Sequence, residues 1–357
     1  MMRTLLVVAL GLGLGCGDNI KLAEDGGVED DADVTDGGPF DYPNDPSGYE
    51  ANLISYISEI TIPELDQDDD PTCCFDFGSI SKNDGLDNAY ATFMQEINDL
   101  VPLFDAQQEY DELLARNPQD NPLVWLIDHR GLAVGQSDQF RMAFLYGAME
   151  GDTTQPDARA GTGTFTISSR SFEPGTGTPL SAFDAVFFSE PTGAVLSPSG
   201  SMFVPFALAN TELQLPLEAA RVRGTAVPTN DGVSYSRGEI SGYITVDDFF
   251  GTLNDTLEER CSCIADELPI FTKNVDGDWV ESCPTGPTVV NACGGSPLTE
   301  VCVGIAGRVQ DGGACSQFPL LVPNQVDIDT DGDDEYDAIS FGLEFIAARG
   351  EVVDSNE

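Results

Sequence analysis

The residues with the clearest potential for chemistry lie near the C-terminus, between positions 327 and 337. The stretch reads Asp-Ile-Asp-Thr-Asp-Gly-Asp-Asp-Glu-Tyr-Asp, so aspartates alternate with other residues and a glycine follows the third one. Crowded carboxylates repel one another, and such a loop therefore needs water or a cation. Calcium prefers oxygen ligands, and a glycine lets a loop turn sharply around the ion. We expect a calcium site formed by Asp327, Asp329, Asp331 and Asp337, with the carbonyl of Asp333.

At its first six positions this loop resembles the DxDxDG calcium loops of thrombospondin type 3 repeats and dockerins. It departs from the EF-hand pattern, because position twelve is Ala338 instead of a bidentate glutamate. Apolar residues then recur at every second position from Ile339 to Phe345, which predicts a strand. The ion would neutralise the carboxylates and fix a strand over 339–346 in a sheet. The alternative is a solvated acidic turn without metal.

A second acidic stretch contains the sequence Asp-Gly-Leu-Asp-Asn at 84–88. It resembles the Asp-Gly-x-Asp-Asn pattern that precedes a helix in bacterial surface lipoproteins. Asp87 or Asn88 is suited to cap a helix that begins at Ala89. Two interpretations stay open for this stretch. Its residues are either turn and cap residues only, or they form a second metal site from Asp76, Asn83, Asp84 and Asp87.

The first 16 residues carry one arginine, an apolar run and small residues before a cysteine. This composition predicts a secretion signal, and the segment is too short to span a membrane as a helix. Its end, with Gly15 before Cys16, resembles the lipobox of bacterial lipoproteins. The resemblance implies that Cys16 carries a lipid anchor and that the protein lies at the outer membrane or cell surface. An ordinary signal peptide cleaved nearby is the alternative.

Nine cysteines occur in the chain, and eight remain when Cys16 is set aside. An exported chain meets an oxidising compartment, so an even number predicts disulfides. Zinc is disfavoured, because there is no CxxC pair and the single histidine is His129. We expect the two adjacent N-terminal cysteines to bond to the C-terminal cluster. The predicted disulfide cysteines are Cys73, Cys74, Cys261, Cys263, Cys283, Cys293, Cys302 and Cys315.

The charge of the chain is extreme, with 62 acidic against 15 basic residues and a formal net charge of −47. Nucleic acid and anionic membrane surfaces are therefore poor partners, because both repel such a surface. The charge suits divalent cations, and it also suits a protein kept soluble in high salt. With 41% hydrophobic residues in a length of 357, most of the chain should fold around one large or two ordinary cores.

These segments predict the organisation of the chain. Residues 1–16 are the lipoprotein signal peptide, 17–48 an acidic disordered tether and 351–357 a flexible tail. Residues 49–150 are expected to form a small α+β lobe, with helices over 89–101 and 104–116 and a strand over 123–128. In residues 151–350, short alternating runs between turns predict a mainly β domain, an antiparallel sandwich or barrel with a few helices, stapled by disulfides. One amphipathic helix is expected at about 247–264.

Signals for catalysis are weak. The sequence lacks a P-loop, a dinucleotide fingerprint and the GxSxG elbow that would accompany a hydrolase triad. His129 follows a predicted strand directly, and we interpret it as an ordinary surface residue. Catalysis by a carboxylate pair, as in glycosidases, stays open. Trp125 and Trp279 could stack on sugar rings, although core or interface positions are expected for both.

The sequence therefore predicts a non-enzymatic, lipid-anchored, calcium-stabilised extracytoplasmic protein with a structural or binding role. Its partners are the membrane, through the anchor, and an unidentified glycan or protein at the cell surface. One alternative is a secreted carbohydrate-active enzyme or carbohydrate-binding module. Another is an adhesion or assembly subunit, which an exposed apolar patch would identify.

Overall fold

The computed structural model describes residue 49 and residues 53–63, 88–100, 105–116, 122–208, 211–275, 277–294, 299–307, 314–331 and 335–353. Its strands are β1 Leu53–Thr61, β2 Trp125–Arg130, β3 Asp138–Met149, β4 Gly163–Ile167, β5 Ala182–Ser189, β6 Ala194–Leu196, β7 Gly200–Leu208, β8 Thr211–Thr229, β9 Gly232–Thr245, β10 Phe271–Lys273, β11 Trp279–Glu281 and β12 Ala338–Val352. Its helices are α1 Ala89–Leu100, α2 Ala106–Ala115, α3 Gln155–Arg159, α4 Val246–Arg260, α5 Gly286–Cys293, α6 Thr299–Ala306 and α7 Phe318–Leu321. The predicted signal peptide, tether and most of the tail lie outside the described residues.

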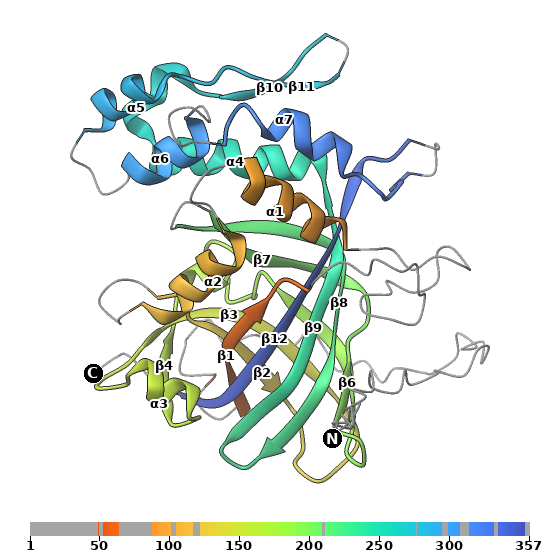
Figure 1. Cartoon of the computed structure of the whole chain (residues 1–357). Coiled ribbons are helices and arrows are strands. Elements are labelled where there is room, and N and C mark those ends of the chain that lie inside the picture. Colours follow the sequence, from red (N-terminus) through yellow and green to blue (C-terminus); the bar gives the residue numbers. More distant parts are fainter. Residues whose placement is uncertain are drawn as a thin grey trace, which may run out of the picture.

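Strand pairings close on themselves in the main sheet, which has ten strands. Antiparallel ladders run in the order β1-β2-β3-β5-β6-β8-β9-β12, and β12 pairs again with β1. Figure 1 shows the long strands β8, β9 and β12 curving together through the body of the molecule. The predicted fold class is thus confirmed: the protein is mainly β, with a few helices and with disulfides.

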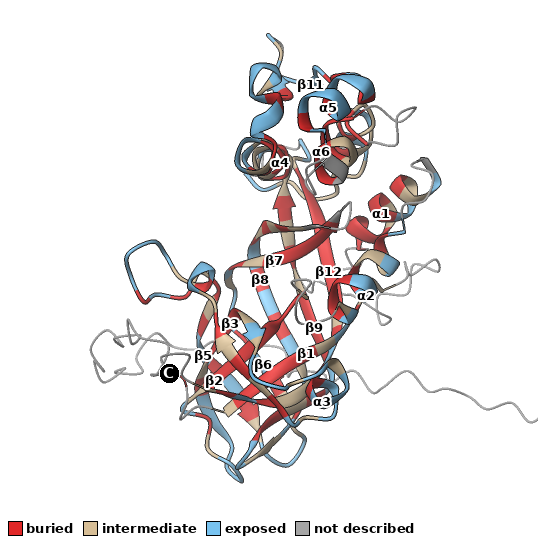
Figure 2. Cartoon of the chain, turned by 90° about the vertical axis from the view of Figure 1, so that its left-hand side faces the viewer, coloured by how far each residue is buried: buried red, intermediate tan, exposed pale blue. Residues whose placement is uncertain are grey.

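The inner face of this ring holds the larger hydrophobic core. Alternate residues of each strand point into it, for example Ile127, Phe144, Val222, Tyr235 and Phe345. This period of two is the pattern that the sequence of β12 predicts. Figure 2 shows the buried residues following the strands, while α5 and β11 are largely exposed.

β12 is buried on both faces over its first half, which a simple alternation does not predict. Ser340 and Gly342 lie on the face opposite the ring core, and both contact the start of α1. Ser340 is fully buried. The start of α1 therefore packs against this half of the strand, and Tyr90 of α1 contacts Phe341 in the larger core with ring centroids 4.4 Å apart.

A second, smaller core lies outside the ring, on the other face of β1, β2 and β3. Tyr56 stacks on Phe165 there at 5.1 Å between ring centroids. Phe165 belongs to β4, which pairs with β3 and, in parallel, with the end of β12. α3, whose N-terminus is closed by a capping box at Thr154, packs over the same place.

Helices cover one end of the ring, at the top of Figure 1. α4 begins directly after β9, where the Thr245 side chain accepts a hydrogen bond from the Asp248 amide. Phe249 joins this helix to the rest of the core, with ring contacts to Phe93, Phe206 and Phe318. The helices predicted over 89–101, 104–116 and 247–264 are confirmed as α1, α2 and α4, and α4 ends at Arg260.

The expected division at residue 150 falls between β3 and β4 of the same sheet. β1 pairs with β12 from Ile54 to Thr61, so the first and last strands of the described chain lie side by side. The structure differs here from the expectation of a separate N-terminal lobe. The physical reason is that strand edges need hydrogen-bond partners, and β1 finds one in β2 and the other in β12, near the opposite end of the chain.

Candidate functional site

The described ends of the acidic loop 327–337 are bonded to each other. Ile328 and Ala338 form an isolated antiparallel bridge. Both carboxylate oxygens of Asp337 accept hydrogen bonds from Thr330, from its amide at 3.0 Å and its hydroxyl at 2.6 Å. Asp327 accepts from the Ser340 amide at 2.7 Å and also from the Ser340 hydroxyl. Two of the predicted calcium ligands therefore already bind donors of the protein.

The calcium prediction stays a prediction. Within the described residues, one group of three His, Cys, Asp or Glu side chains has ligand atoms within 4.8 Å of one another, and it consists of cysteines. Asp327, Asp329, Asp331 and Asp337 form no such group among those residues, while Asp333 lies outside them. Asp76, Asn83, Asp84 and Asp87 of the second acidic stretch also lie outside. Asn88, at its end, donates to the Gly342 carbonyl at 3.0 Å.

The cysteine group is accounted for by disulfides. Cys261 bonds to Cys302, Cys263 to Cys293, and Cys283 to Cys315. Disulfide formation in the C-terminal cluster is thus confirmed. The prediction that Cys73 and Cys74 bond to this cluster is wrong, because all six of its cysteines are bonded to one another. Cys73, Cys74 and the predicted lipidation site Cys16 lie outside the described residues.

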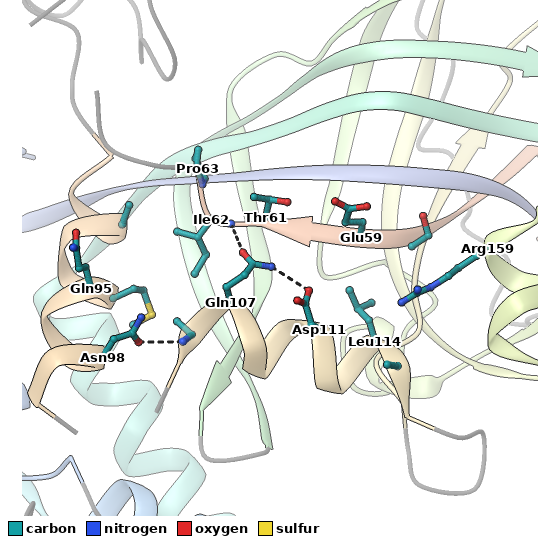
Figure 3. A pocket seen from close by; sticks show the side chains of 15 residues that line it. Glu59, Thr61, Ile62, Pro63, Gln95, Asn98, Gln107, Asp111, Leu114 and Arg159 are labelled. Carbon is teal, nitrogen blue, oxygen red and sulfur yellow. Dashed lines mark hydrogen bonds between the residues drawn. The ribbon is translucent and has the colours of Figure 1, made fainter. Parts of the chain in front are cut away.

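A large cleft lies between β1 and the helices α1 and α2, and we call it the β1–α2 cleft (Figure 3). Its volume is about 1310 Å³. The described residues that line it include none with an aromatic side chain. Its polar lining residues are Ser58, Glu59, Thr61, Gln95, Asn98, Gln107, Asp111 and Arg159.

Charges in this cleft come from three different elements. Glu59 lies on β1, Asp111 on α2 and Arg159 at the end of α3. Figure 3 shows Arg159 reaching into the cleft at the end opposite Gln95 and Asn98. Arg159 has no ion pair in the part of the chain that the structure describes. A second hollow, of about 410 Å³, continues the cleft beyond Arg159 and is also lined by Arg349.

Gln107 ties α2 to the edge of β1. Its side-chain amide donates to the Ile60 carbonyl at 2.8 Å and accepts from the Ile62 amide at 3.0 Å. β1 pairs with β2 only from Leu53 to Tyr56, so beyond Tyr56 this edge of β1 faces the cleft. The single carboxamide thus occupies the place that the peptide group of a neighbouring strand would take.

His129 lies on β2, and its interpretation as a surface residue is wrong. The ring is buried between Phe140 and Tyr235, with Nδ1 3.0 Å from the Leu53 carbonyl and Nε2 2.8 Å from the Tyr235 hydroxyl. Burial lowers the pKa of His129 to about 4, against smaller opposing effects of hydrogen bonds to Leu53 and Ile127. The strand continues to Arg130 and places the histidine in the core. Neither of its hydrogen-bond partners, Leu53 and Tyr235, lines the β1–α2 cleft.

A mostly buried carboxylate on β8, with its side chain 11% exposed, was not expected from the sequence. Glu212 binds Arg170 at 3.0 Å, and the Arg170 guanidinium lies 4.1 Å from the centre of the Tyr146 ring. Burial raises the pKa of Glu212, and the charge of Arg170 opposes that effect. Arg170 therefore compensates a carboxylate that would otherwise lose solvation without a partner.

Sequence reasoning missed the β1–α2 cleft because its polar residues lie on separate elements without a shared motif. Trp125 is a core residue, and Trp279 stacks on Phe250 at 4.8 Å, so neither tryptophan lines the cleft. A single glutamine on a helix and a single arginine after a capping box do not by themselves indicate a binding site. Tertiary contacts of α2 and α3 with β1 bring them together.

Comparisons with protein-family models, with curated proteins and with solved structures found no match to this chain. Among the described helices, none combines the length and the apolar character that crossing a membrane requires.

Proposed function

We propose that this protein is an exported, lipid-anchored binding protein that takes a polar ligand in the β1–α2 cleft, with calcium stabilising the 327–337 loop. The observation that carries the binding role is the cleft itself, a large hollow with an arginine that lacks an ion pair within the described chain. In a chain with net charge −47, an unpaired arginine is a scarce group. It is suited to bind a carboxylate or phosphate.

Export is supported by chemistry of the chain itself. Three disulfides persist in oxidising compartments and are rare in the reducing cytosol. The leader that resembles a lipobox supplies the anchor at Cys16. A Cys16→Ser variant expressed in a bacterial host should move from the membrane fraction to the soluble extract. If the variant fractionates like the wild type, the anchor is not at Cys16.

The binding role is tested by a thermal-shift screen of the full mature chain against peptides, oligosaccharides and small anions. At least one class should raise the melting temperature, and Arg159→Gln should remove that shift. Arg221→Gln is the matched control, because Arg221 is also exposed, lies on β8 away from the cleft and has no ion pair within the described residues. If no class shifts the wild type, the proposal fails.

One observation favours the carbohydrate-active alternative. Glu59 and Asp111 bring two carboxyl groups to the same cleft from β1 and α2, which is the pair of groups that glycoside hydrolysis uses. Chromogenic glycosides test this function directly. An enzyme of this class should release the chromophore, and Glu59→Gln or Asp111→Asn should abolish the reaction. Absence of hydrolysis across α- and β-linked substrates would leave the binding role alone.

A further inference from the structure

The edge of β1 shows what kind of ligand the β1–α2 cleft fits, and the inference rests on the proposed binding role. From Ile57 to Thr61, β1 pairs with β12 on one side, and in the described chain no strand pairs with its other side. That open side faces the cleft, which Ser58 and Thr61 line. Strand edges of this kind bind extended peptides through backbone hydrogen bonds.

The hydrogen bonds of Gln107 show which backbone groups of this edge point toward the cleft. Its carboxamide is chemically equivalent to a peptide group, and it satisfies one carbonyl and one amide two residues apart, at 2.8 and 3.0 Å. This edge of β1 therefore presents both a hydrogen-bond acceptor and a hydrogen-bond donor to a neighbouring group. Gln107 also donates to Asp111 at 3.2 Å, so its side-chain amide already has a hydrogen-bond partner on α2 besides those on β1.

The size and lining of the cleft favour a peptide over the other polar ligands. A volume of about 1310 Å³ is larger than that of sites for single drug-sized molecules, which span about 300–1,000 Å³. A chain of several residues is thus the matching size. Sugar rings are commonly held by the faces of aromatic side chains, and the described lining has none.

Charges along the cleft specify the peptide further. Glu59 and Asp111 line the cleft from β1 and from α2, so each of these two elements supplies a carboxyl group that can bind a basic side chain of the ligand. Arg159 lies at one end, where a carboxylate would bind through charge-assisted hydrogen bonds. We infer that the β1–α2 cleft binds an extended peptide segment of another protein, paired edge-on with β1, with a basic residue at Glu59 and Asp111 and a carboxylate at Arg159.

The experiment uses the full mature chain and an array of synthetic ten-residue peptides with varied charge and with free or amidated C-termini. Peptides that combine a basic side chain with a carboxylate should be retained. For the strongest binder, Arg159→Gln should weaken affinity about tenfold or more, whereas Arg221→Gln should leave it within about twofold. Circular dichroism and melting curves establish that both variants are folded.

A backbone scan of the same peptide separates strand addition from binding by side chains alone. Methylating single amide nitrogens removes one donor at a time, and strand pairing predicts loss of binding at every second residue. If no methylated position changes the affinity, or if Arg159→Gln leaves peptide binding unchanged, the inference is wrong, but the binding role is not. If no peptide binds while another ligand class gives an Arg159-dependent thermal shift, the inference fails and the proposed function stands. If no ligand class binds, both the inference and the proposed function are wrong.

Discussion

Asp327 and Ser340 form a bidentate contact, in which the aspartate carboxylate accepts from both the amide and the hydroxyl of the serine. The serine hydroxyl accepts in turn from the amide of Ala89, the first residue of α1, at 3.0 Å. The negative charge therefore lies one residue away from the positive end of a helix, where it is stabilising. This chain of contacts connects the acidic loop, β12 and α1.

Removing this contact should destabilise the fold. Ser340→Ala removes the hydroxyl that accepts from the Ala89 amide and donates to Asp327, so we expect the free energy of unfolding to fall by about 1–3 kcal/mol. Urea denaturation measures the change. Ser241→Ala on the neighbouring strand β9 is the control, because no side-chain bond of Ser241 occurs among the described residues. Equal stability of the two variants would show that the contact contributes nothing.

Calcium should stabilise the protein if the loop binds it. At a concentration about 100 times the dissociation constant, a ligand specific for the folded state adds about 2.7 kcal/mol. Melting curves of the mature chain in calcium and in EDTA should then differ, and Asp329→Asn with Asp331→Asn should remove the difference. If isothermal titration with calcium gives no heat of binding and EDTA leaves the melting temperature unchanged, the acidic turn is solvated and binds no calcium.

His129 should make stability depend on pH in a defined window. The pKa of about 4 in the folded state lies below the ordinary value near 6.5, so the unfolded chain takes up the proton first as pH falls. Stability from this group is complete above pH ~6.5 and is lost as pH falls toward 4, by about 3 kcal/mol in all. Comparing wild type and His129→Gln between pH 5 and 6.5 checks this. Parallel curves for both proteins would contradict the burial argument.

The disulfides should hold the helical end of the molecule. They close loops with sequence separations of 41, 30 and 32 residues, and the chain-entropy model gives about 4 kcal/mol for loops of this length. Replacing Cys261 and Cys302 together by serine should lower the melting temperature strongly. Peptide mapping under non-reducing conditions checks the pairing itself. Any peptide that links Cys73 or Cys74 to the cluster would contradict it.

A glycine on β9 should tolerate no side chain. A Cβ at Gly238 would collide with the ring of Phe345 on the paired strand β12. We expect Gly238→Ala to destabilise the protein by about 1–3 kcal/mol. Gly251→Ala in α4 is the matched control, because a Cβ there meets nothing within 4 Å, and a gain of about 0.5–1 kcal/mol is expected. Thermal melting of both variants decides between steric conflict and a general glycine effect.

The local secondary structure could be predicted from the sequence. Alternating apolar residues from Ile339 onward predicted β12, and the cap residues Asp87 and Asn88 predicted the start of α1. These signals depend on neighbours in sequence, and periodicity therefore reports them. The even cysteine count of the whole chain predicted disulfides. It did not give their pairing, because pairing depends on which loops meet.

The sequence by itself determined the fold class, the position of its main helices and the chemistry of the disulfide cluster. The tertiary structure alone decided that β1 pairs with β12, that His129 is buried and that Glu59, Gln107, Asp111 and Arg159 share one cleft. The physical reason is the closure of the sheet. Closing it requires partners from opposite ends of the chain, and contacts over such separations leave no periodic trace in the residues that make them.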